Sequence, residues 1–251
     1  MLGIHDTDRE WSRWADHDPF YAVLSDSKYR NRQNLEIFFQ TGEEHFKGVV
    51  QQFCQLGFPL LRQGQSMDYG CGVGRVLRPM ADYFDCVVGI DVAISMLHEA
   101  EKYIHGKNVV LKHFNGKNLD DCLDEGIFEF IHSALVLQHI RPKRGFRILE
   151  NLLQRLSPGG KAYIQLPVYA EKKWAYLINQ IVTCHPALLK LSRRLLKKTQ
   201  YKNDPTMQMN VYPADRLIHL FNHQKVKVIS LDVKEDLKNS LLTVEWYLVK
   251  H

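Results

Sequence analysis

Three glycines at alternate positions stand between an apolar run and a segment with helical spacing. The stretch reads Met67-Asp68-Tyr69-Gly70-Cys71-Gly72-Val73-Gly74-Arg75. This pattern predicts a strand that ends in a tight turn and opens a helix, since glycine lets the backbone bend sharply and admits a ligand where a Cβ would stand. Asp91 follows Gly70 by 21 residues, at the end of the next apolar run. A carboxylate in that position accepts hydrogen bonds from ribose hydroxyls. The two features together predict a site for a nucleoside-containing cofactor.

The spacing of the glycines argues against a dinucleotide. The dinucleotide pattern needs a third glycine where a pyrophosphate approaches a helix N-terminus, and Arg75 occupies that place here. The arrangement D-x-G-x-G-x-G resembles instead the first motif of class I S-adenosylmethionine-dependent methyltransferases. The resemblance implies that the glycine loop lies against the methionine part of the cofactor and that Asp91 binds its ribose.

Further segments are similar to the same family, in the family's order. Residues 91–97 resemble its acid-x-S-x-x-M-L segment, with Ala93 in place of the common serine. Residues 128–140 resemble its fourth strand and V-L-Q-H-I turn, and 156–161 its L-x-P-G-G turn. Asn115 stands where the family often has an acid near the adenine, and its side-chain carbonyl can accept the same bond. The resemblance covers about residues 65–167 and implies S-adenosylmethionine as the cofactor. The cofactor contacts that it implies are Asp68, Gly70, Cys71, Gly72, Arg75, Asp91, Val92, Met96, Asn115, Gly116, Ser133 and Leu135.

Short apolar strands that alternate with longer helices predict an α/β fold with a parallel, doubly wound sheet. Strands are expected at 65–69, 86–91, 109–114, 127–133 and 161–166, and helices near 74–84, 94–104 and 143–156. A helix at 213–222 and two strands at 226–229 and 241–249 are expected to complete the chain. The resemblance implies a Rossmann-like seven-stranded sheet in the order 3-2-1-4-5-7-6, with the last strand antiparallel. Ligands of such sheets bind at the carboxyl ends of the strands, where Gly70, Asp91, Asn115 and Ser133 fall.

The flanking segments are expected to form one domain with this core. Residues 1–60 are predicted as an N-terminal helical lid, 61–251 as the methyltransferase core, and 168–212 as a helical insertion on the substrate side. Within the lid we expect short helices at 8–14 and 34–39, a turn at 18–21, and an amphipathic helix over 43–56 capped by Thr41. The aromatic residues of the lid could line the active site, with packing of the lid as the alternative for each: Trp11, Trp14, Phe20, Tyr21 and Tyr29. Of these, Trp14, Tyr21 and Tyr29 are the candidates for the substrate side.

Methyl transfer from a sulfonium is an in-line displacement in which the protein holds the acceptor and excludes water. A hydroxyl acceptor also benefits from a base, and His139 in Leu137-Gln138-His139-Ile140 is the candidate, with bracing of the turn as the alternative. Gln138 is placed on the substrate side with it. No N/D-P-P-Y/F motif and no Pro-Cys pair is present, so the amino-adenine, glutamine and cytosine-C5 patterns are excluded. A small-molecule acceptor, in some cases lipid-linked or a glycan, methylated on O or N, is the expectation.

Composition restricts the remaining classes. No window reaches the length of an apolar membrane span, and the N-terminus lacks a signal-peptide layout. Five scattered cysteines without a C-x-x-C pair favour reduced thiols in the cytoplasm and no metal site. The net charge is +5, and eight cations against two acids lie between Val168 and Asp204. Within that stretch an amphipathic helix is expected over 187–198, with cations on one face, and a solvated face is one interpretation of it. That segment leaves two alternatives to catalysis open: a non-catalytic cofactor-binding module, and a binder of a membrane surface or, less favoured, of nucleic acid.

Overall fold

The computed structural model describes residues 7–106, 108–123, 127–184, 188, 205, 207–237 and 239–251. Seven strands form one sheet in the order β3-β2-β1-β4-β5-β7-β6. β7 runs antiparallel to β5 and β6, and the other neighbours are parallel. The strands are β1 (Gln65–Tyr69), β2 (Cys86–Asp91), β3 (Val109–His113), β4 (Phe128–Ser133), β5 (Leu156–Ala170), β6 (Val226–Asp236) and β7 (Leu241–Lys250). The predicted fold class and strand order are confirmed.

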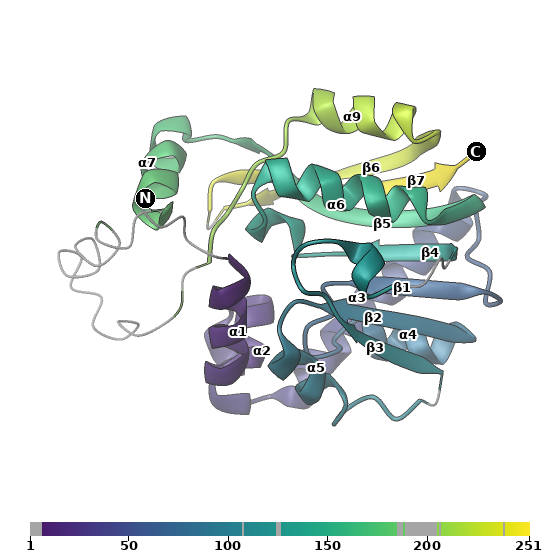
Figure 1. Cartoon of the computed structure of the whole chain (residues 1–251), viewed down its shortest axis with the longest axis horizontal. Coiled ribbons are helices and arrows are strands. Elements are labelled where there is room, and N and C mark those ends of the chain that lie inside the picture. The colour runs from purple at the N-terminus through teal and green to yellow at the C-terminus, as the bar shows by residue number, and fades with distance from the viewer. Residues whose placement is uncertain are drawn as a thin grey trace.

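Helices cover the sheet and its carboxyl edge. α6 and α9 lie along one face, while α1 and α7 lie beyond the ends of the parallel strands (Figure 1). The helices are α1 (Thr7–His17), α2 (Pro19–Leu24), α3 (Leu35–Gln55), α4 (Leu77–Tyr83), α5 (Ile94–Ala100), α6 (Pro142–Gln154), α7 (Lys173–Cys184) and α9 (Ala214–His223). Short 3₁₀ helices occupy Ser27–Arg32, Leu119–Asp121 and Leu137–His139. No helix among the described residues is long and apolar enough to cross a bilayer.

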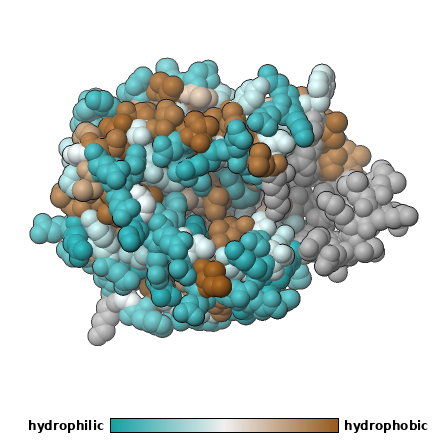
Figure 2. Space-filling model, turned by 180° about the vertical axis from the view of Figure 1, so that it is seen from behind, coloured by the Kyte–Doolittle hydropathy of each residue, from teal (hydrophilic) through white to brown (hydrophobic). Residues whose placement is uncertain are grey.

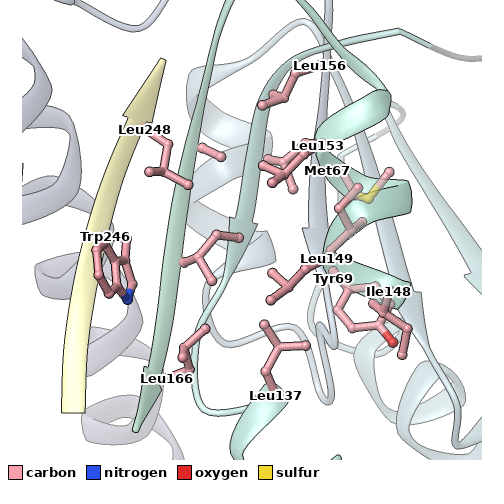
Figure 3. Close-up of a cluster of buried hydrophobic side chains, with 14 of the residues drawn as sticks. Met67, Tyr69, Leu137, Ile148, Leu149, Leu153, Leu156, Leu166, Trp246 and Leu248 are labelled. Atoms are coloured by element: carbon pink, nitrogen blue, oxygen red, sulfur yellow. The ribbon is translucent and has the colours of Figure 1, made fainter. Parts of the chain in front are cut away.

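Successive strand residues face opposite sides of the sheet, and both sides are buried. On one side Met67, Ile131 and Leu248 pack against the apolar stripe of α6, which includes Leu149 and Leu153 (Figure 3). On the other side Phe130, Tyr163 and Tyr247 pack with residues of α3 and α4. Because both faces of the sheet are buried, both alternating sets of strand residues are apolar, and the strands appear in the sequence as nearly continuous apolar runs.

The N-terminal segment that was predicted as a lid differs from the prediction in its helices. Residues 35–55 form one helix, α3, instead of two, and Thr41 is not a cap: its Oγ1 donates to Phe38 O within the helix at 2.6 Å. The capping-box pattern was misleading because Gly42 is needed for a close contact in the middle of the helix. A Cβ on Gly42 would lie 2.0 Å from the backbone oxygen of Arg75. α3 therefore crosses directly over the turn that follows the glycine loop.

Two other segments depart from expectation. The turn expected at 18–21 is the start of α2, since Pro19 occupies the first helical turn, where a missing N–H costs nothing. The helix expected over 187–198 lies outside the described residues except for Leu188. Within the predicted insertion, the structure describes α7, which follows β5 directly.

Candidate functional site

The glycine loop turns at the carboxyl end of β1 and is fastened to β2. The backbone N–H groups of Gly70 and Cys71 both donate to Ile90 O, at 2.7 and 3.0 Å. Gly70 has a φ of 77° and Gly72 a φ of 53°, in the left-handed region that other residues rarely adopt. A Cβ on Gly70 would also lie 2.2 Å from Val136 Cγ2. The loop thus presents bare backbone to the space beyond the strand.

Asp91 lies beside the loop, at the end of β2. Its Oδ2 accepts from the Gly72 N–H at 2.9 Å and its Oδ1 from the Ala93 N–H at 2.8 Å. Burial raises the pKa of Asp91 to about 6, although the two backbone N–H groups oppose the rise. Each carboxylate oxygen keeps a second lone pair, so Asp91 can accept further bonds from a ligand while it holds the loop.

A cavity opens beside the glycine loop and Asp91. It contains about 700 Å³ of non-atom space, part of which is open to solvent. Most of its wall is apolar, and the polar groups are few, which is typical of a cofactor site. The lining residues are Thr7, Asp8, Trp11, Val23, Tyr69, Gly70, Gly72, Ile90, Asp91, Val92, Met96, Phe114, Ala134, Leu135, Val136, His139, Ile140 and Arg144.

α1 closes one side of this cavity. Asp8 Oδ1 pairs with Arg144 Nη1 of α6 at 2.8 Å, and the Ser95 hydroxyl of α5 donates to Asp16 at 2.6 Å. Between this salt bridge and this hydrogen bond, the centroid of the Trp11 ring lies 4.8 Å from that of the His139 ring. α1 is therefore held against two core helices and a core turn, and it shields the cavity from water.

A second, wider groove adjoins the cavity. It is lined by residues from α2, from the turn after β4, from the segment before α9, and from the hairpin between β6 and β7. Its lining residues are Tyr21, Ala22, Val23, Leu24, Ser25, Leu135, Gln138, His139, Gln165, Met207, Met209, Lys234, Glu235, Asp236, Leu237, Asn239 and Thr243. Val23, Leu135 and His139 belong to both walls. These three residues lie where the cavity and the groove adjoin.

The backbone at this shared wall is strained. Leu135 has a φ of 63°, which is unusual for a bulky residue and is found where the surroundings enforce it. Its N–H donates to Gln165 Oε1 of β5 at 3.2 Å, and that bond holds the turn open. Gln165 therefore positions the wall as well as lining the groove.

His139 is buried at the same wall and is held at both ring nitrogens. Its Nδ1 lies 2.7 Å from Gln208 O, so this nitrogen carries the proton and donates. Its Nε2 lies 3.1 Å from the Gln138 amide nitrogen, from which it accepts. Burial lowers the pKa of His139 to about 4, although the bond to Gln208 opposes the drop. The imidazole is thus neutral near pH 7 and offers an acceptor, not a charge.

Half of the predicted cofactor contacts line the cavity, namely Gly70, Gly72, Asp91, Val92, Met96 and Leu135. Asp68 does not: strand alternation turns it to the opposite face, where its Oδ1 lies 2.7 Å from His132 Nδ1. The other His132 nitrogen lies 2.9 Å from His45 Nε2 of α3. Asp68 thus belongs to a buried chain of hydrogen bonds beneath the loop.

The remaining predicted contacts also point elsewhere. Arg75 donates to Thr41 O at 3.2 Å, which fastens α3 to the loop, and Ser133 Oγ donates to Tyr69 O at 3.1 Å. Cys71 is packed in the core, where burial raises the pKa of its thiol well above the usual value. Asn115 bonds to Asp121 and the Lys117 N–H, and Gly116 lines a separate hollow beside α6.

Two of the substrate-side candidates belong to the core. Trp14 and Tyr29 are buried in a cluster with Phe20, Phe38 and Phe39 and line neither the cavity nor the groove, so the packing alternative describes them. Tyr21, Gln138 and His139 do line the groove. The correction follows from the continuous α3, whose aromatic side chains occupy the space beneath α1 and α2.

Several lining residues were not among those predicted. Phe114 directly follows β3, a position that places it at the carboxyl edge of the sheet, so the strand assignment could have identified it. Asp8, Val23 and Arg144 come from α1, α2 and α6, and no local sequence signal marks them, whereas Trp11 of α1 was among the lid aromatics expected near the site. Their role depends on how these helices pack.

A seven-stranded sheet in this order, with a glycine loop after β1 and an acid after β2, defines the class I S-adenosylmethionine-dependent methyltransferase fold. The chain belongs to the methyltransferase domain family, which matches residues 43–231. The sequence-based assignment of class and cofactor is thereby confirmed. No curated protein matches the chain in sequence.

Solved structures agree with this fold over nearly the whole chain. One is magnesium protoporphyrin IX methyltransferase (ChlM) from Synechocystis PCC 6803 with bound SAH, at a TM-score of 0.62 and 14% identity, covering 97% of this chain and 98% of that one. Another is the N-methyltransferase NodS from Bradyrhizobium japonicum WM9 with SAH, at a TM-score of 0.61 and 11% identity, covering 98% and 99%. At such identities the likeness concerns the fold.

Proposed function

We propose that the chain transfers a methyl group from S-adenosylmethionine in the cavity to an O or N atom of a small molecule in the adjoining groove. The observation that carries this proposal is the shared wall of Val23, Leu135 and His139. Because these residues line both spaces, the cavity and the groove adjoin, and an acceptor in the groove can approach the methyl carbon in line where the two spaces meet.

The cavity suits the cofactor chemically. Gly70 and Gly72 leave backbone exposed, Asp91 supplies acceptors for ribose hydroxyls, and Phe114 and Met96 provide apolar surface for an adenine. When bound, S-adenosylmethionine supplies an activated methyl group. The chain contributes binding, orientation and exclusion of water, the last through α1.

The groove suits an uncharged or positively charged acceptor with apolar parts. Met207 and Met209 offer adaptable apolar surface, while Gln138, Gln165 and Thr243 offer hydrogen-bonding groups. The charged lining residues are one cation, Lys234, and two carboxylates, Glu235 and Asp236. The names of the similar structures refer to magnesium protoporphyrin IX in one case and to N-methylation in the other, so fold alone does not select the acceptor atom.

His139, which lies where the cavity and the groove adjoin, is better suited to position the acceptor than to act as a strong base. With a pKa of about 4 it accepts a hydrogen bond from an acceptor hydroxyl or amine but holds a transferred proton poorly near pH 7. We therefore assign His139 a role in orienting the acceptor, whose hydrogen bond to Nε2 would replace the one from Gln138.

The proposal predicts that narrowing the groove slows methyl transfer without weakening cofactor binding. Met207→Trp places a larger side chain in the groove and leaves the cavity lining intact. We expect the cofactor Kd to stay within about twofold, and methyl transfer to fall about tenfold or more, as for a misplaced acceptor. The assay uses methyl-labelled S-adenosylmethionine and a low-molecular-mass cell extract. Equal transfer by both proteins would place the acceptor elsewhere; absence of cofactor binding by the unaltered protein would reject the whole proposal.

Cofactor affinity is expected to depend on pH through Asp91. The ionised carboxylate is the better acceptor for ribose hydroxyls, and its pKa in the folded protein is about 6. Cofactor binding should therefore be tightest above pH 7 and weaken as the pH is lowered through 6. At pH 5 only about a tenth of a group with this pKa is ionised, which gives about tenfold weaker binding. Calorimetric titration from pH 5 to 8 measures this change, and Asp91→Asn should show a flat profile. A wild-type profile as flat as that of the variant would contradict the assignment.

A further inference from the structure

α7 exposes large apolar side chains along one face. Trp174, Leu177, Ile178 and Ile181 are 80%, 49%, 60% and 55% exposed. They are spaced i, i+3, i+4 and i+7, so they form a single stripe on the helix. Helices of a globular protein ordinarily turn such a stripe towards the core, and a contiguous exposed one marks an interaction surface.

The opposite face of α7 attaches the helix to the protein through polar groups. The Tyr176 hydroxyl accepts from the Val211 N–H at 3.1 Å, and the Gln180 amide donates to Met209 O. Tyr176 and Gln180 are four residues apart and lie across the helix from the apolar stripe. The polar contacts thus fix the helix with its apolar side outward. Figure 1 shows α7 standing away from the sheet, and Figure 2 shows brown apolar surface at that side of the molecule.

The charge of this part of the sequence argues for one occupant of the stripe. α7 contains Lys173 and neither Asp nor Glu, and Glu171 and Lys172 directly precede it. In the sequence, residues 171–198 contain seven Lys and Arg and one acidic residue. A second copy of the chain, paired about a two-fold axis at α7, would set one net positive charge against another, which is unfavourable. Anionic lipid headgroups complement the same charges, and an exposed tryptophan beside leucine and isoleucine suits the headgroup boundary.

We propose that α7 is an interfacial helix that docks the protein on an anionic lipid surface. A helix of 12 residues is about 18 Å long, too short to span a bilayer, and it lies in the interface with its apolar face down. This inference does not depend on catalysis. Because Met209 both anchors Gln180 and lines the groove, a docked membrane would lie beside the groove and favour an amphiphilic acceptor; that last step alone rests on the proposed function.

Vesicle sedimentation with the full chain tests the proposal without cofactor. Vesicles of phosphatidylcholine with and without phosphatidylglycerol are compared. We expect binding to the anionic vesicles, weakened by salt, and at least about tenfold weaker partition for an Ile178→Ser/Ile181→Ser double variant. Ile218→Ser is the matched control, since Ile218 is an exposed isoleucine of another helix, at 46%. Thermal unfolding checks that all variants fold.

Tryptophan emission gives a second measurement. Trp14 and Trp246 are buried and Trp11 is half-buried, whereas Trp174 is exposed, so a blue shift on adding anionic vesicles should be lost in Trp174→Phe. No binding by the unaltered protein, or equal binding by the double variant, would overturn the proposal. A dimer in light scattering that the double variant abolishes, without vesicle binding, would instead assign the stripe to a second copy. Cofactor titration is unaffected by these outcomes, so a failure here is distinct from a failure of the proposed function.

Discussion

Gly42→Ala is expected to lower the free energy of unfolding by about 2–3 kcal/mol, as overpacking of a tight core does. The added Cβ would lie 2.0 Å from the carbonyl oxygen and 2.7 Å from the carbonyl carbon of Arg75. These are backbone atoms and cannot rotate away as a flexible side chain can. α3 must therefore move off the turn, and the turn follows Gly74 directly. We also expect weaker cofactor binding, because the displaced backbone continues into the glycine loop.

Gly48→Ala is the matched control for this change. Gly48 lies in the same helix, and a Cβ there meets nothing within 4 Å. Since alanine is the better helix former, this substitution should raise stability by up to about 1 kcal/mol. Urea denaturation of the two variants beside the unaltered protein measures both effects. Similar free energies for Gly42→Ala and Gly48→Ala would show that α3 does not press on the Arg75 backbone.

Asp91→Ala is expected to weaken binding of S-adenosylmethionine by about 1.5–3 kcal/mol, that is, about tenfold to more than a hundredfold. The carboxylate is the acceptor proposed for the ribose, and hydrogen bonds to a charged group are worth this much when their partner stays buried. The substitution also removes the acceptors of the Gly72 and Ala93 N–H groups, so Gly72 loses its bond to β2 while the bonds of Gly70 and Cys71 to Ile90 O remain. Calorimetric titration with S-adenosylmethionine and S-adenosylhomocysteine gives the change directly.

Two further variants separate the causes. Asp91→Asn keeps an oxygen acceptor without the charge and should fall between the unaltered protein and Asp91→Ala. Asp82→Ala removes an exposed carboxylate of α4, outside the cavity lining, and should leave the Kd unchanged. If Asp91→Ala bound the cofactor as tightly as Asp82→Ala, the ribose would have to lie elsewhere.

The sequence by itself determined the strands and the chemistry expected at their ends, and its resemblance to a family implied the strand order. Period-two and helical spacing are local properties, and the glycines and Asp91 sit at strand ends, whose position in a parallel sheet follows from topology. The glycine loop could be predicted for the same reason: a left-handed backbone restricts residue type wherever it occurs. Five of the lining residues predicted with Asp91 come from such strand ends or from the segments that directly follow them, namely Gly70, Gly72, Val92, Met96 and Leu135.

Only the tertiary structure decided which side chains meet. Asp68 and Arg75 belong to the motif, yet Asp68 bonds to His132 and Arg75 bonds to Thr41 of α3. The face that a side chain takes depends on what packs against it. The groove combines Tyr21, Met209 and Thr243, which lie far apart in the chain, and no local signal records such a juxtaposition. The apolar stripe of α7 reads in sequence as an ordinary core-facing stripe. It faces outward because Tyr176 and Gln180 take the contacts with the 207–211 segment, and a helix can present only one face to its support.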